Sequence, residues 1–408
     1  MSGNRWKWWI AIVLFLATVL TYLDRQTLSL CAPMICKEMN LSDEQYGELL
    51  AAFRWAYALT HLLAGVLADR FPLRVTYSLA VLVWSAAGAA ASFARQFSQL
   101  LWTRRVLGFG EAFNWPCATR IVANLLPPQD RGLASGIFNS GSAAGSLAAP
   151  FIILPLAQWL GWRSAFFIIG SLGLVWIALW LFVTRRGTPA SNAIRPTPSA
   201  MTVRWIARPG FWMLLLVGVS VNPCWYFLND WIPKYMHDQR GMSQLTAGMI
   251  SAPIFLAADF GNLAGGGLVK FLASRGWTLR RARGTTVTLA VLLILPVALI
   301  TRVSSATAVV TMLGCAAFGI TAILANYTAC QADFSFANVG AVAGVLGMAC
   351  NVFAATVNPW VGRYVDATGT YNLIFVLIGV LPLVALAAIL TFDALVWRTH
   401  DRDTAGRV

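Results

Sequence analysis

Four ionisable residues stand out because they interrupt stretches of the chain that are otherwise apolar. Asp24 and Arg25 follow the run "WWIAIVLFLATVL", and Arg104 precedes Glu111 by seven residues in "RRVLGFGE". Seven residues make two helical turns, so Arg104 and Glu111 share one helix face about 10 Å apart. Tyr22, three residues before Arg25, lies on the same face as Arg25. A guanidinium beside a phenol suits a carboxylate ligand, because it can bind both carboxylate oxygens.

The elements that position these residues are expected to be membrane helices. Of the 408 residues, 58% are hydrophobic and 11% are charged, against about a quarter charged in soluble domains. The net charge of +14 does not indicate nucleic acid, because the basic residues lie between apolar runs rather than in a patch with interleaved aromatics. The seven cysteines lie in or beside those runs without paired spacing, which favours packing over disulfides or a metal site.

Twelve apolar runs are long enough to cross a bilayer as helices. The first is too long for a signal peptide and lacks a cleavage site, so it should stay in the membrane. Lys and Arg gather in alternate loops, which predicts that both termini are cytoplasmic. The expected spans are 8–35, 45–68, 74–94, 99–126, 131–157, 163–184, 209–235, 244–271, 285–302, 306–331, 338–362 and 371–397.

The spans divide six and six around a polar interval. Residues 185–208 are rich in Pro, Ser and Arg and read as a cytoplasmic linker. The predicted domains are therefore an N-terminal six-helix bundle, 1–184, and a C-terminal one, 209–408. "GVLADRFPLR" after the second span is echoed by "GGLVKFLASR" after the eighth. Duplicated halves are typical of a parallel-repeat transporter with its substrate site near the midplane.

The motif "GVLADR", with Gly65, Asp69, Arg70 and then Arg74, resembles the signature of the major facilitator superfamily, although Pro72 and Val75 depart from it. "YLDR", "FRWAYALTHLLAG" and "RRVLGFGEAFNWPCATRIVANLLPPQDRG" together resemble the anion:cation symporter family within it, especially bacterial hexuronate and D-galactonate transporters. The resemblance implies an all-α membrane protein of twelve helices in two bundles. The signature residues would form a cytoplasmic gate, with glycine permitting close helix packing.

The same resemblance implies roles for the four ionisable residues. Arg25 would bind the substrate anion, with Tyr22 and Arg104 beside it, whereas Asp24 and Glu111 would couple transport to protons. An ionisable group at membrane depth costs several kcal/mol unless it pairs, faces water or has a function. The structural alternatives are that Arg25 and Asp24 only pair with other charges, and that Arg104 and Glu111 form a permanent ion pair with help from another helix.

Further candidates are less firmly placed. Tyr57 matches a substrate-contacting tyrosine of the family, although it could be a core residue. Arg54 and His61 depart from the family; they could add a second positive contact and a titrating group, or simply pack. Trp225, Tyr226 and Asn229 could form the opposite wall of the site, with Asn351 as a family substrate contact. Asp259 is a further polar residue in an apolar helix, and it could instead form a hydrogen bond to a neighbouring helix.

We therefore expect a proton-driven symporter of the bacterial inner membrane that imports a sugar-acid anion by alternating access, with hexuronate the first choice and galactonate the second. Sodium is the alternative coupling ion. We expect no cofactor or metal, no nucleic acid partner, and a monomer in the lipid bilayer. Efflux or facilitated transport of an organic anion or drug is the rival function. No metal-ligand cluster or serine-histidine-acid set in the sequence supports an enzyme, and no added signalling domain supports a receptor.

Overall fold

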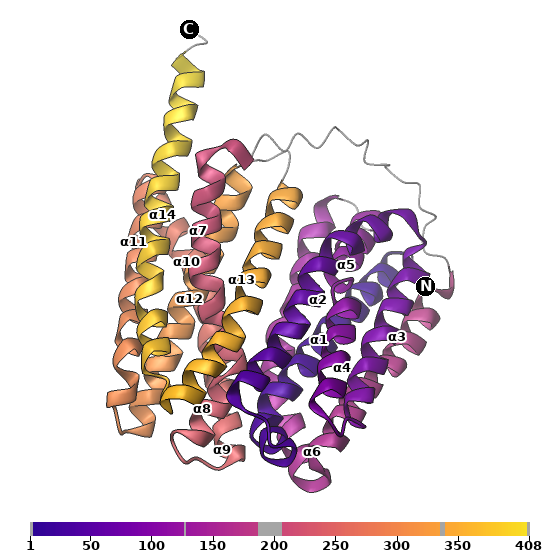
Figure 1. Ribbon diagram of the computed structural model, residues 1–408. Helices are drawn as coiled ribbons and strands as arrows, with labels where there is room; N and C mark the ends of the chain where they lie inside the picture. Colours follow the sequence, from indigo (N-terminus) through magenta and orange to yellow (C-terminus); the bar gives the residue numbers. More distant parts are fainter. Residues whose placement is uncertain (1–2, 126–127, 187–205, 335–338, 406–408) are drawn as a thin grey trace. The chain divides into compact units, whose positions relative to one another are not determined.

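The computed structural model describes residues 3–125, 128–186, 206–334 and 339–405, and all regular structure in these ranges is helical (Figure 1). The predicted all-α architecture is therefore confirmed. The elements are α1 (Gly3–Met39), α2 (Asp43–Arg70), α3 (Leu73–Ala91), α4 (Phe97–Glu111), α5 (Asn114–Leu125), α6 (Pro128–Val183), η1 (Thr184–Arg186), α7 (Pro209–Asp230), α8 (Ile232–Asp238), α9 (Gln244–Met249), α10 (Ser251–Ser274), α11 (Leu279–Ile294), η3 (Leu295–Arg302), α12 (Ala306–Phe334), α13 (Val339–Thr368) and α14 (Asn372–Ala405).

Nine helical stretches among the described residues are long and apolar enough to cross a bilayer. Helix α2 is not among them, since it carries charged residues at both ends and near its middle, and α4 is only 15 residues long. The expected spans 131–157 and 163–184 both lie in α6, which is interrupted at Gly161 with φ of 82°. Glycine tolerates this backbone conformation because it has no Cβ. The count of twelve and the cytoplasmic termini stay predictions.

Four of the expected spans are not continuous helices. A proline lies in the first turn after each interruption, and it lacks the N–H that would continue the helical hydrogen bonding. The predicted spans did not include these interruptions. The breaks lie between α4 and α5 (Pro116), α7 and α8 (Pro233), α9 and α10 (Pro253), and at the change from α11 to η3 (Pro296).

The chain forms two compact units. The first comprises Met1–Thr197, Asp230–Ala252 and Ala355–Thr368, and the second comprises Pro198–Asn229, Pro253–Ala354 and Gly369–Val408. Two short segments from the second half of the sequence therefore belong to the first unit. The predicted domains 1–184 and 209–408 remain a prediction.

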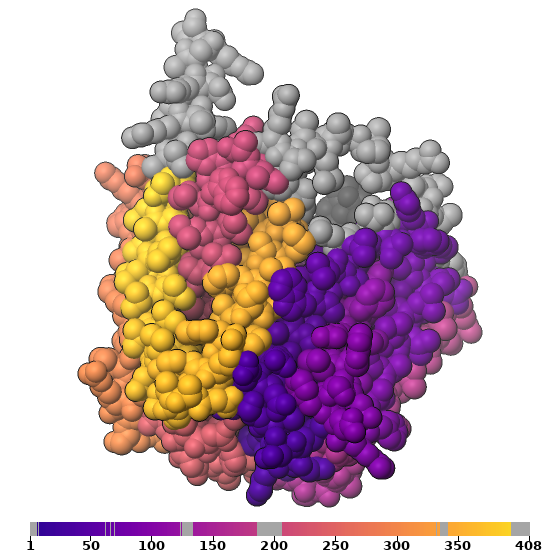
Figure 2. Space-filling model, viewed as in Figure 1, coloured from indigo at the N-terminus to yellow at the C-terminus, as the bar shows by residue number. Residues whose placement is uncertain are grey.

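In the first unit, α1 packs on α6, α3 packs on α6 and α4, and α2 packs on α4 (Figure 1). Its core contains the fully buried aromatics Tyr77, Trp84 and Trp180. On the face drawn in Figure 2, side chains of these helices, coloured indigo to magenta, fill the spaces between the ribbons. Dense packing of this kind fixes the register of one helix against the next.

Helices α2 and α4 are in close contact at Gly108. A Cβ added to Gly108 would lie 2.4 Å from the main-chain oxygen of Phe53 and 3.2 Å from the Cβ of Ala56. Only glycine therefore allows this crossing. Because Gly108 lies between Arg104 and Glu111 in α4, the crossing brings both of these side chains next to α2.

We predict that Gly108→Ala lowers the thermal stability of the purified protein, because the new methyl group forces α2 and α4 apart. Overpacking of this kind costs about 1–3 kcal/mol, which thermal unfolding in detergent would detect. Gly136→Ala is the matched control, since no described atom lies within 4 Å of a Cβ at that position. Equal melting temperatures for the two variants would contradict the proposed crossing.

Candidate functional site

A buried ion pair joins α1 to α4. The Nε of Arg25 lies 2.6 Å from Oε2 of Glu111, whose side chain is fully buried, whereas that of Arg25 is 27% exposed. The guanidinium carbon of Arg25 lies 5.3 Å from the ring centre of Tyr22 and 5.0 Å from that of Tyr57. Both distances fall within the range of cation–π attraction. The structure thus brings together four of the residues that the sequence singled out.

Arg104 lies close to this pair but does not join it. Its residue is 3% exposed, and its guanidinium carbon lies 5.0 Å from the ring centre of Phe53. Among the described residues, Nε and Nη1 of Arg104 have no hydrogen-bond partner, and neither does Oε1 of Glu111. The permanent Arg104–Glu111 ion pair that we weighed as an alternative is not formed, because Glu111 pairs with Arg25 of another helix.

Asp24 faces a different part of the first unit. It is 6% exposed, and its Oδ1 lies 3.2 Å from the position of a Cβ added to Gly88 in α3, which would also lie 3.2 Å from Gly170 in α6. Neighbouring residues on a helix point about 100° apart, so Asp24 has different packing neighbours from Arg25, although the charges of Arg25, Arg104 and Glu111 still act on it. The coupling role of Asp24 stays a prediction.

Arg54 and His61 have different neighbours. Arg54 forms an ion pair with the carboxylate of Asp230, and the main-chain oxygen of Asp230 accepts hydrogen bonds from Ser29 and Tyr46. Arg54 therefore connects α2 to the end of α7. The ring of His61 stacks on that of Tyr57 with ring centres 5.4 Å apart, and Tyr57 in turn contacts the guanidinium of Arg25. Their suggested roles in substrate binding and titration stay predictions.

The remaining substrate candidates belong to the second unit. Asn229 donates a hydrogen bond to the main-chain oxygen of Trp225 at 2.9 Å, and Asn351 donates one to Gly347 at 3.0 Å. Trp225 packs edge-on against Phe255 with ring centres 6.1 Å apart. Tyr226 and Asp259 are both partly buried. Their role as a second wall of the site stays a prediction.

The gate signature is described only in part. Arg74 donates to the main-chain oxygen of Leu181 at 3.1 Å, and Arg70 is the exposed last residue of α2. A Cβ at Gly65 would meet no described atom within 4 Å, so the described residues form no close packing there, and the role of Gly65 stays a prediction. The side chain of Asp69 lies outside the described part of the chain.

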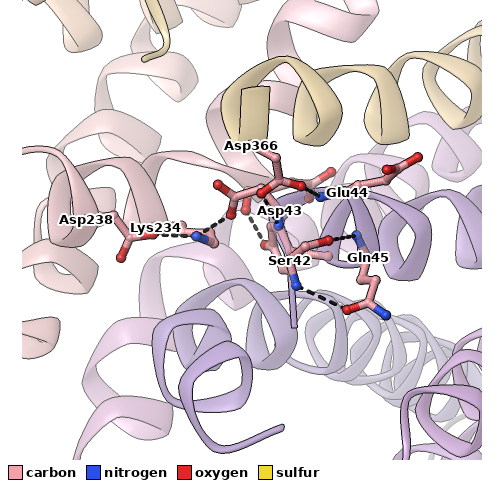
Figure 3. Close-up of polar contacts among 9 residues, drawn as sticks. Ser42, Asp43, Glu44, Gln45, Lys234, Asp238 and Asp366 are labelled. Atoms are coloured by element: carbon pink, nitrogen blue, oxygen red, sulfur yellow. Dashed lines mark hydrogen bonds and ion pairs between the residues drawn. The ribbon is translucent and has the colours of Figure 1, made fainter. Parts of the chain in front are cut away.

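Sequence reasoning missed a group of charges at the start of α2, which we call the Lys234 cluster: Asp43, Lys234, Asp238 and Asp366. Figure 3 shows the ammonium of Lys234 between Asp43 and Asp238. The two carboxylate oxygens of Asp366 accept hydrogen bonds from the backbone N–H groups of Asp43 and Glu44, each with a nitrogen–oxygen distance of 2.8 Å. Ser42 and Gln45 complete a capping box at the same helix end, which stabilises the first turn of α2.

The Lys234 cluster also shifts the titration of its members. Burial raises the pKa of the Asp43 carboxyl, and the nearby carboxylates add to this effect. Together they outweigh the Lys234 ammonium, which acts to lower the same pKa. For Lys234 burial acts to lower the pKa, but the carboxylates of Asp43 and Asp238 outweigh it and raise the pKa to about 12. The capping box "SDEQ" was readable in the sequence, whereas the partners of Asp43 lie 190 residues or more along the chain and left no local signal.

Comparison with known proteins identifies the class. The family description of the Major Facilitator Superfamily matches residues 14–356, and the chain belongs to this superfamily of membrane transporters. The chain is 28% identical to a probable galactarate/D-glucarate transporter of Escherichia coli K12, covering 95% of each chain. It is also 28% identical to a hexuronate transporter of Bacillus subtilis 168, covering 94% of each chain. The predicted resemblance is therefore confirmed.

Solved structures agree on the fold. A bacterial homolog of the human lysosomal transporter Spinster, inward-facing and occupied, superposes with a TM-score of 0.78 at 22% identity over 98% of both chains. A D-xylose–proton symporter gives a TM-score of 0.76 at 14% identity, covering 94% of this chain and 97% of the other. The chain is a multi-pass transporter of the inner membrane and not an enzyme, as predicted.

We predict that Lys234→Met lowers the stability of the first unit far more than Arg363→Met. Lys234 is 7% exposed and its loss leaves Asp43 without a cation, whereas the Arg363–Glu44 pair is 61% and 41% exposed. Breaking a buried pair costs about 3–5 kcal/mol, but an exposed pair contributes about 0–1 kcal/mol. Thermal unfolding in detergent measures both losses.

The pH dependence supplies a second check on the Lys234 cluster. The pKa of Lys234 is raised from 10.5 to about 12 in the folded state, so its stabilisation is fully present below pH 10.5 and lost as the pH rises through 12. The difference between wild type and Lys234→Met should therefore stay constant from neutral pH to about pH 10. A difference that disappears within this range would contradict the ion-pair assignment.

Proposed function

We propose that this transporter is a proton-coupled symporter that imports a sugar-acid anion by alternating access, with hexuronates such as glucuronate and galacturonate as first candidates and galactonate as the second. The observation that carries the proposal is the Arg25–Glu111 ion pair. It lies near the guanidinium of Arg104, of which Nε and Nη1 have no hydrogen-bond partner among the described residues. The curated relatives are named for hexuronate and for galactarate or glucarate, which supports a sugar-acid substrate.

The chemistry of the site fits a carboxylate. Arg25 binds Glu111 through Nε, and once released from Glu111 its guanidinium offers a planar fork of N–H groups that matches the two oxygens of a substrate carboxylate. Tyr22 and Tyr57 lie beside it, and their hydroxyls suit the hydroxyl groups of a sugar acid. Arg104 supplies a second cation. A small hydroxylated anion is therefore the ligand class that these groups favour.

Proton coupling follows from competition for Arg25. A substrate carboxylate that binds Arg25 displaces Glu111, and a displaced carboxylate in an apolar, fully buried position is costly. Taking up a proton removes that charge, so anion binding and protonation of Glu111 favour each other. When the substrate leaves, Arg25 returns to Glu111 and the proton is released. The coupling ion in this scheme is the proton, and no cofactor takes part.

We predict that Glu111→Gln abolishes accumulation but not exchange. In proteoliposomes with an inward proton gradient, wild type should accumulate labelled glucuronate, galacturonate or galactonate above the external concentration. The variant should reach a ratio of about one, because it lacks the carboxyl group that competes with the substrate anion for Arg25 and whose protonation is linked to anion binding there. Its exchange of internal for external substrate should continue, since the cations of the site remain.

Glu38→Gln is the matched control, because Glu38 is an exposed acid that pairs with Arg163. It should accumulate substrate like wild type. Accumulation by Glu111→Gln equal to wild type would contradict the coupling role of Glu111. Wild-type uptake that ignores the proton gradient would contradict proton symport, and uptake of none of the three acids would contradict the proposed substrate class.

A further inference from the structure

Phe53 lies against both cations of the site. The guanidinium carbon of Arg25 and that of Arg104 each lie 5.0 Å from the centre of its ring, so the two carbons are at most about 10 Å apart. Phe53 is 5% exposed, and two cations this close in buried surroundings repel each other. The negatively polarised face of an aromatic ring attracts cations, so the ring stabilises both.

The position of the ring is fixed by its surroundings. The main-chain oxygen of Phe53 is the atom that meets Gly108 at the α2–α4 crossing, and Gly108 lies between Arg104 and Glu111. The ring of Phe53 also stacks on that of Tyr57, with ring centres 5.8 Å apart and planes at 28°. Backbone packing and ring stacking thus hold Phe53 beside Arg104.

Two buried side chains of α4 with opposite charges do not pair with each other. Arg104 and Glu111 carry opposite charges on one helix face, and each is almost fully buried. Among the described residues, two guanidinium nitrogens of Arg104 and Oε1 of Glu111 have no hydrogen-bond partner, yet the two side chains form no ion pair. Burial without partners disfavours both groups, so other interactions must hold Arg104 where it is. The carboxylates of Asp24 and Asp230 attract it, and the ring of Phe53 adds an aromatic face 5.0 Å from its guanidinium carbon.

We propose that Phe53 is a positioning residue that holds the guanidinium of Arg104 away from Glu111 and so keeps it available for the substrate carboxylate. This inference rests on the proposed function, because it deepens the account of the same anion site. Without the ring, Arg104 turns to Oε1 of Glu111, and the substrate then competes with Glu111 for both cations instead of one.

The first test replaces the ring. Phe53→Leu should raise the KM for uptake of the transported sugar acid about tenfold, the scale of a desolvated cation–π contact, with a smaller change in kcat. Phe138→Leu is the matched control, since Phe138 is 1% exposed and its ring contacts Trp115. A series of increasingly fluorinated phenylalanines at position 53 keeps the shape but weakens the ring's attraction for cations, and KM should rise with each fluorine.

The second test asks whether Glu111 captures Arg104. In exchange assays, which do not depend on coupling, Phe53→Leu combined with Glu111→Gln should recover most of the affinity that Phe53→Leu loses, because the carboxylate of Glu111 is no longer there to capture Arg104. Such non-additivity identifies an interaction between positions. A KM that is indifferent to fluorination, or effects of the two substitutions that simply add, would overturn the proposal.

A readout without substrate separates this inference from the proposed function. Melting temperatures of Arg104→Met, Glu111→Gln and the double variant form a cycle that measures Arg104–Glu111 coupling. The cycle should show a weak coupling in the wild-type background, from the through-space attraction between the two charges, and a clearly stronger one in the Phe53→Leu background. Equal coupling in both backgrounds would overturn the positioning role of Phe53, whether or not any sugar acid is transported. Uptake of none of the acids with the expected cycle would overturn only the proposed substrate class.

Discussion

The structure of the first unit depends on the cost of keeping charges in apolar surroundings. Glu111 has no exposed side-chain surface, and the 2.6 Å contact with Arg25 is what makes its charge tolerable. That contact requires the side chains of Arg25 and Glu111 to reach each other from α1 and α4, and it requires α2 to cross α4 closely enough for Phe53 and Tyr57 to cover Arg25. The absence of a side chain at Gly108 permits this arrangement. Packing, ring stacking and ion pairing thus satisfy one electrostatic requirement.

Two groups of charges in this unit, the Lys234 cluster and the residues around Arg25, differ in how completely their hydrogen bonds and ion pairs are formed. In the Lys234 cluster the ammonium has two carboxylate partners, and Asp366 uses both oxygens on the backbone of α2. Because these charges already have partners, a change of conformation would form few additional ion pairs or hydrogen bonds in this cluster. Around Arg25, by contrast, Glu111 and Arg104 keep atoms without hydrogen-bond partners among the described residues. The incompletely satisfied group is the one that an incoming anion and a proton can change, which is why we assign function to it.

Sequence alone predicted the relations that lie within one helix. Arg25 with Tyr22 follows from the helical period, as does the shared face of Arg104 and Glu111. The sequence did not predict which arginine would form an ion pair with Glu111, because the answer depends on how α1, α2 and α4 pack together. The Arg54–Asp230 pair, 176 residues apart, and the contact of Asp366 with the start of α2 were equally hidden. A proline follows each helix interruption, but Pro33, Pro223 and Pro359 lie inside continuous helices, so proline alone did not predict where a helix would be interrupted.

The central claim is that anion binding at Arg25 and protonation of Glu111 are one linked event. The most direct test counts the protons that the purified transporter takes up when it binds a hexuronate, using a pH indicator in weakly buffered detergent solution. The account predicts about one proton per bound anion for wild type and none for Glu111→Gln at equal occupancy. Binding to wild type without proton uptake, or equal uptake by both proteins, would contradict it.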